Sequence, residues 1–182
     1  MPMYHGSNNA IDKIDLDRCN PRTDFGKGFY LSDKYGTAKQ WAIRKALVLG
    51  GMPTVLRYEL DILHLDMYGK RFPRTPDLKW LYFICENRKS IPQNHVSKEP
   101  RHDYHWVSGP IADDKIVDVV GEFINGLIDA EMAINKAKAL PQTYQLSLHT
   151  ENALSFLNDI DVYYKQFKNG VWSSNWTKRK YN

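Results

Sequence analysis

Segments in which apolar and polar residues alternate predict that much of this chain forms short β-strands. The clearest is TVLRYELD at residues 54–61, and TYQLSLHT at residues 143–150 alternates as strictly. Other short runs share this pattern or are rich in β-branched and aromatic residues, and we predict strands at residues 3–5, 29–32, 104–110 and 115–120.

A helical period of apolar positions marks a second group of segments. In TAKQWAIRKALVL at residues 37–49, Ala38, Trp41 and Ala42 share one face, and the pair Gly50–Gly51 provides a stop signal. We predict further helices at residues 76–89, at residues 121–140 and from Glu151 onward. Short strands that are separated by helices without regular alternation indicate an α+β fold.

Composition fits one compact domain with a short extension. The chain has 182 residues, of which 42% are hydrophobic, and we expect a domain at residues 1–160 and an extension of open role at residues 161–182. No apolar stretch reaches the roughly 18 residues of a membrane-spanning helix. Two cysteines and the lack of a signal-peptide pattern favour the cytoplasm. The net charge of +4 is low for a dedicated nucleic-acid binder.

The stretch DFGKGFY at residues 24–30 raises the question of a phosphate-binding loop. Gly28 follows Lys27, where a Walker loop needs Ser or Thr. A dinucleotide-binding fingerprint opens a helix, whereas here a predicted strand follows the glycines. His102 and His105 are three residues apart in a loop that leads into a strand, so they do not share a helix face and we predict no metal site.

Four separate motifs instead occur in a defined order along the chain. They are YHGS (4–7), FGKGFYLSDKYGTAKQW (25–41), GPIADD (109–114) and YQLSLHT (144–150). Together they resemble the ADP-ribosyltransferase superfamily, on its poly(ADP-ribose) polymerase-like side with a His-Tyr-Glu triad. The set looks most like the bacterial DUF3990 family, over residues 3–158. The resemblance implies a split β-sheet sandwich with flanking helices, and NAD as co-substrate.

The resemblance also implies roles for individual residues. His5 would hydrogen-bond a ribose hydroxyl of NAD, and Tyr30 would lie against the nicotinamide ring. Gly6 would offer its backbone to the carboxamide, a contact that leaves no room for a side chain. Ala38 stands where the family usually has a small hydroxylated residue. The implied NAD-binding set is His5, Gly6, Ser7, Gly28, Tyr30, Ala38 and Trp41.

The third catalytic position departs from the family pattern, because Gln145 stands where glutamate is usual. Its amide oxygen can accept a hydrogen bond from a ribose hydroxyl, but it supplies no charge and no general base. We therefore expect transfer of a single ADP-ribose. A carboxylate from elsewhere could supply the missing charge, and the candidates by motif are Glu151, Asp113 and Asp114.

These expectations combine into a mono-ADP-ribosyltransferase with His5, Tyr30 and Gln145 as its catalytic residues. The resemblance implies a protein acceptor, with arginine favoured, and a toxin or effector role that a small antitoxin or inhibitor protein neutralises. Three alternatives stay open. They are NAD hydrolysis, a non-catalytic module that binds NAD or protein, and ADP-ribosylation of nucleic acid.

Overall fold

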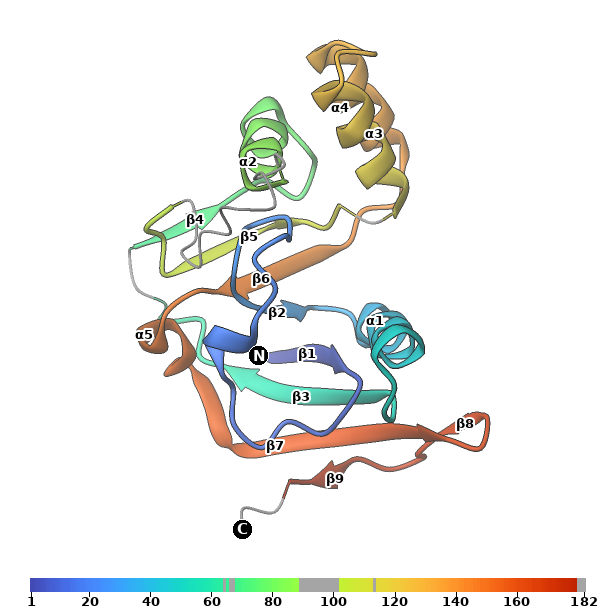
Figure 1. Ribbon diagram of the computed structural model, residues 1–182. Coiled ribbons are helices and arrows are strands. Elements are labelled where there is room, and N and C mark those ends of the chain that lie inside the picture. Colours follow the sequence, from blue (N-terminus) through green and yellow to red (C-terminus); the bar gives the residue numbers. More distant parts are fainter. Residues whose placement is uncertain (64, 66–67, 89–101, 113, 180–182) are drawn as a thin grey trace. The chain divides into compact units, whose positions relative to one another are not determined.

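The computed structural model describes residues 1–63, 65, 68–88, 102–112 and 114–179 (Figure 1). The chain divides into two compact units. Unit 1 consists of residues 1–15, 30–67 and 151–182, and unit 2 consists of residues 16–29 and 68–150. Each unit is therefore assembled from stretches that are far apart in the sequence.

Unit 1 contains an antiparallel sheet in which β2, β1, β3 and β7 are neighbours in that order, and β8 and β9 each pair with β7. Its helix α1 packs on β1 and β3. The strands are β1 (Pro2–Ser7), β2 (Phe29–Ser32), β3 (Thr54–Leu60), β7 (Leu157–Lys168), β8 (Val171–Trp172) and β9 (Thr177–Lys178), and the helices are α1 (Tyr35–Leu49) and α5 (Glu151–Leu154).

The strand β7 crosses residue 160, where the sequence suggested that the domain gives way to an extension. It pairs with β3 from Thr54↔Gln166 to Leu60↔Leu157, and Figure 1 shows it running along β3 into the short β8 hairpin. Residues beyond β7 also contribute to packing, since Trp172 lies against the core of unit 1. In unit 1, residues 161–179 thus belong to the sheet and its cover.

Unit 2 contains three neighbouring strands with β5 in the centre. It pairs in parallel with β4 and antiparallel with β6. The elements of unit 2 are η1 (Leu16–Arg18), β4 (Gly69–Arg71), α2 (Leu78–Arg88), β5 (Trp106–Pro110), α3 (Asp114–Ile124), α4 (Ala130–Ala139) and β6 (Tyr144–Leu148).

The prediction of a strand at residues 115–120 was wrong, because this segment lies in α3. Ile116, Val119 and Val120 are spaced by three and four residues, and this spacing puts all three on one buried helix face. The predicted single helix at residues 121–140 is instead two helices. Gly126 adopts φ 71° after α3, and the side chain of Asp129 accepts a hydrogen bond from Met132 N at 2.8 Å to start α4.

The α+β class predicted from the sequence is confirmed. Helices and strands do not alternate regularly in either unit. The strands β4 and β5 pair in parallel, whereas the pairs β5–β6, β1–β3 and β3–β7 are antiparallel. In the described part of the chain, no helix is both long enough and apolar enough to cross a membrane.

Candidate functional site

His5 lies on β1 in unit 1, where it is buried and held in one tautomer. Its Nδ1 donates a hydrogen bond to the backbone oxygen of Tyr30 on β2 at 2.7 Å. Its Nε2 is therefore the acceptor nitrogen, and Lys45 Nζ lies 3.4 Å from it. Burial and the nearby Lys45 cation hold the pKa of His5 well below its usual 6.5, although the bond to Tyr30 favours the charged ring. His5 is thus a neutral imidazole with a defined acceptor.

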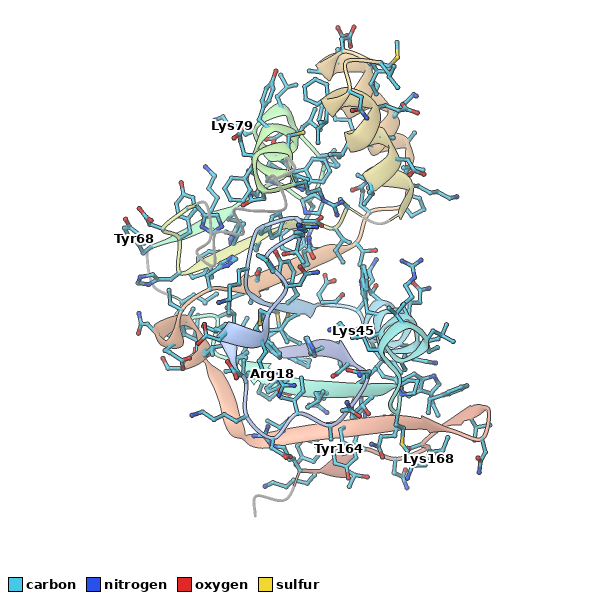
Figure 2. The ribbon with its side chains drawn as sticks, viewed as in Figure 1. Arg18, Lys45, Tyr68, Lys79, Tyr164 and Lys168 are labelled. Atoms are coloured by element: carbon cyan, nitrogen blue, oxygen red, sulfur yellow. The ribbon has the colours of Figure 1, made fainter. Side chains whose placement is uncertain are left out.

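Lys45 is a residue of this site that the motifs did not indicate. Its Nζ donates a hydrogen bond to Gly6 O at 2.8 Å in addition to its contact with His5. Figure 2 labels Lys45 on α1. One signal in the sequence could have identified it. Lys45 follows Ala38 and Ala42 at helical spacing, so it lies at the end of the face that α1 turns towards β1.

Gly6 is required by the packing of α1 on β1. A Cβ at Gly6 would lie 2.8 Å from Ala42 N and closer still to Ala38 O. The backbone of the helix thus occupies the space that a side chain would need. Next to it, Ser7 is buried and its Oγ accepts a hydrogen bond from Asn9 N at 3.3 Å. The close approach of α1 therefore explains why position 6 is glycine, independently of any contact with the NAD carboxamide.

The two aromatic residues expected to contact nicotinamide differ in their surroundings within unit 1. Tyr30 is half-buried on β2, next to the backbone contact with His5. Trp41 is 40% exposed on α1, and the Arg44 guanidinium lies 5.5 Å from the centre of its ring. Unit 1 thus brings together six of the residues of the implied NAD-binding set, namely His5, Gly6, Ser7, Tyr30, Ala38 and Trp41.

Gln145 lies on β6 in unit 2, where a carboxylate fixes its amide. Its Nε2 donates a hydrogen bond to Asp24 Oδ2 at 2.7 Å. Since a carboxylate only accepts hydrogen bonds, the amide must turn its NH₂ group towards Asp24 and its oxygen away. Gln145 is 6% exposed, so few other orientations are open to it. This arrangement presents the amide oxygen as an acceptor.

Asp24 is the carboxylate that contacts Gln145, and the sequence did not single it out. It also accepts hydrogen bonds from Ala112 N at 2.9 Å and from Arg88 Nε at 3.0 Å, with a second, shorter contact to Arg88 Nη2. The guanidinium compensates the charge of the carboxylate, and the pair is largely withdrawn from water. Asp24 therefore orients Gln145 rather than replacing the charge of a glutamate.

The three residues that the motifs suggested as auxiliary carboxylates do not lie together in one unit, as far as the structure describes them. Glu151 is exposed in the first turn of α5, in unit 1. Asp114 is the first residue of α3, in unit 2. Asp113 lies outside the described residues.

The loop at residues 24–28 also contacts β6 and His149, the residue that follows β6. His149 Nδ1 donates a hydrogen bond to Lys27 O at 2.7 Å. A Cβ at Gly28 would lie 2.5 Å from Ser147 Oγ and 2.7 Å from His149 Nδ1, so a side chain there would displace these two side chains or the loop itself. Phe25 is fully buried in the same unit. The glycine-containing stretch is thus a buried loop that fixes side chains of β6.

The two histidines considered as metal ligands lie in different surroundings. His102 stands edge-on to His149, with ring centres 4.7 Å apart, and bonds to Phe25 O. His105 lies beside Tyr68 at 5.1 Å. Among the described residues, no group of three or more His, Cys, Asp or Glu side chains could hold a metal ion.

A family model decides which group of proteins this chain is part of. The model of the family described as protein of unknown function (DUF3990) matches residues 1–158. The chain belongs to the DUF3990 family. The resemblance to DUF3990 noted from the motifs is thereby confirmed. Neither the curated proteins nor the solved structures gave a match to this DUF3990 chain.

Proposed function

We propose that this DUF3990 chain is a mono-ADP-ribosyltransferase with the split β-sheet sandwich of that superfamily. It would use NAD, release nicotinamide and transfer one ADP-ribose to a protein acceptor, with arginine favoured. The observation that carries the proposal is the pair formed by His5 and Tyr30 on neighbouring strands. A buried, neutral histidine with a defined acceptor nitrogen is suited to a sugar hydroxyl, and perturbed histidines are more frequent in functional sites than elsewhere.

The proposed reaction breaks the bond between C1′ of the ribose and the nicotinamide nitrogen. The bonding electrons go to the nicotinamide ring, which loses its positive charge, and an oxocarbenium-like ribose remains. A guanidine nitrogen of the acceptor then forms the new bond to C1′ and loses a proton. In this scheme His5 Nε2 accepts a hydrogen bond from a ribose hydroxyl, and the same role is proposed for the oxygen of Gln145 from the family resemblance alone. Accepting at Nε2 requires Lys45 Nζ to share or leave that nitrogen.

Labelled NAD tests the proposal directly. The purified chain is incubated with NAD labelled in its adenylate part and with a bacterial lysate, and we expect label on protein. His5→Ala removes an acceptor from the site and should lower turnover at least tenfold, which corresponds to about 1.4 kcal/mol of transition-state stabilisation. His105→Ala is the matched control, because His105 lies beside Tyr68 in unit 2. If wild type, His5→Ala and His105→Ala consume NAD at equal rates, His5 is not part of the active site.

A second candidate function is a module that binds NAD without consuming it. The surroundings of Gln145 favour this candidate, because the position offers no formal charge and Arg88 compensates that of Asp24. The same experiment separates the functions. NAD binding without consumption supports the module, free ADP-ribose supports hydrolysis, and label on RNA or DNA supports a nucleic-acid acceptor.

A further inference from the structure

The helix α1 exposes apolar side chains where a surface helix is normally polar. Gln40, Trp41, Arg44, Leu47 and Val48 are all exposed and are spaced by three, four and seven residues, so they form one stripe, which we call the outer face of α1. Leu47 and Val48 are 81% and 82% exposed, and Leu49 beside them is 70% exposed. Residues three and four positions apart are neighbours on a helix surface, so Leu47 and Val48 each lie next to Arg44 on the outer face and are not scattered single residues.

The helix cannot turn this face inward. Ala38 and Ala42 are buried on the opposite side, and Gly6 allows the helix backbone to touch β1 directly. The C-terminal end is also fixed, since Asn8 Nδ2 donates a hydrogen bond to Gly50 O at 2.9 Å. The outer face is therefore presented by a helix held at both its inner side and its end.

The charge of the helix indicates what kind of surface would cover it. Among its fifteen residues α1 carries Lys39, Arg44 and Lys45 and no carboxylate. Arg44 lies in the middle of the outer face, over the ring of Trp41. A surface that offers apolar side chains to Leu47 and Val48 and negative charge to this basic helix would therefore fit the outer face.

We propose that the outer face of α1 docks an amphipathic helix of a partner protein that carries carboxylates beside an apolar stripe. The spacing of three, four and seven residues is the spacing with which one helix packs on another. A membrane fits less well, because Arg44 in the centre of the stripe would have to enter the hydrocarbon layer. Nucleic acid also fits less well, because Leu47 and Val48 offer no ring on which bases can stack and the guanidinium of Arg44 already lies over the ring of Trp41. The proposal does not depend on NAD chemistry.

The test uses a synthetic probe and the full chain. The probe is a fluorescent helical peptide with leucine at every third and fourth position and glutamate elsewhere; its twin carries lysine in place of glutamate. Binding is measured by fluorescence anisotropy at low and high salt. The test variant is Leu47→Asp with Val48→Asp. The matched control is Leu63→Asp with Val171→Asp, which makes the same changes at residues of unit 1 that are 88% and 67% exposed.

We expect the glutamate peptide to bind the wild-type chain and the control alike, to bind the test variant at least tenfold more weakly, and to bind less at high salt. The lysine peptide should not bind. Circular dichroism checks that the variants are folded, and Val48→Asp alone replaces the double variant if that one unfolds. Equal binding by the test variant, or no binding at all, overturns the proposal. The proposal is also overturned if the test variant binds the peptide as well as wild type does but loses binding to phosphatidylserine vesicles, loses binding to single-stranded RNA or no longer self-associates.

Discussion

At the scale of single residues, the orientation of Gln145 is the feature that the sequence could not supply. The departure from glutamate is visible in the motif, but the partner is Asp24, which lies 121 positions away. Their contact depends on how the loop at residues 24–28 packs on β6, and no local pattern encodes that packing. The same holds for Lys45, whose contact with His5 spans 40 positions.

Replacing Gln145 with glutamate should destabilise the fold in a pH-dependent manner. The change puts a second carboxyl group about where Nε2 now lies 2.7 Å from Asp24 Oδ2, and two carboxylates so close cannot both ionise. We expect a loss of roughly 1–3 kcal/mol in the free energy of unfolding at neutral pH, which is partly recovered at lower pH as the pair binds a proton. Urea unfolding of Gln145→Glu and Gln145→Met, relative to wild type, from pH 5 to 8 measures this. A pH-independent deficit shared by both variants would contradict the shared proton.

Replacing Lys45 with methionine should raise the pKa of His5. The change removes a cation 3.4 Å from Nε2 but keeps much of the length of the side chain. Burial is the larger cause of the low pKa and persists, so we expect the value to rise but to stay below 6.5. Titration of the His5 ring by nuclear magnetic resonance measures it, with Lys39→Met as the control on the same helix. An unchanged His5 titration would show that Lys45 does not act on the ring.

At the scale of elements, the clearest patterns gave the most accurate boundaries. The strand predicted at residues 54–61 is β3 (Thr54–Leu60), and the helix predicted at residues 37–49 is α1, which begins two residues earlier. Alternation and the Gly50–Gly51 stop explain this success. The strand predicted in α3 failed because isoleucine and valine favour strands in isolation, whereas their helical spacing matched a buried face. The strand β7 was not predicted because it is stabilised by pairing with β3, about 100 residues earlier in the sequence, and not by a local sequence pattern.

Replacing Gly6 with alanine should destabilise unit 1, because the new Cβ meets the backbone of α1 rather than a flexible side chain. We expect a loss of roughly 2–4 kcal/mol, within the range for overpacking at a rigid contact. Gly36→Ala is the control on α1 itself. A Cβ there meets nothing within 4 Å, so helix propensity should leave that variant as stable as wild type or slightly more so. Thermal unfolding compares them, and equal melting temperatures would refute the close contact.

At the scale of the whole molecule, buried neutral histidines link the fold to pH. His5 in unit 1 and His102 and His149 in unit 2 all have a lowered pKa, and in each case burial is the main cause. The unfolded chain binds protons at these positions at a higher pH than the folded chain does. Stability therefore falls as the pH decreases below 6.5. Composition gave the number of histidines but not their burial.

The sharpest part of this pH dependence should come from His149. Burial, together with the nearby His102, lowers its pKa to about 4 despite the hydrogen bond to Lys27 O. Between pH 6.5 and 4 this group alone should cost on the order of 3 kcal/mol, with no further loss below pH 4. His149→Gln should flatten the curve, because glutamine does not titrate in this range. Melting temperatures from pH 4 to 8 measure this, and parallel curves for His149→Gln and wild type would contradict it.

The pairing of β7 with β3 has a consequence for how the chain is made. Synthesis delivers β1, α1 and β3 within the first 60 residues, but their last neighbour follows only from Leu157 onward. Until β7 has been synthesised, β3 presents an unpaired edge of backbone groups, which is a template for pairing with other chains. The stretches of unit 2 all leave the ribosome before β7 does. The unit that is started first is therefore the one completed last, and a ribosome that stalls near residue 150 leaves that edge open.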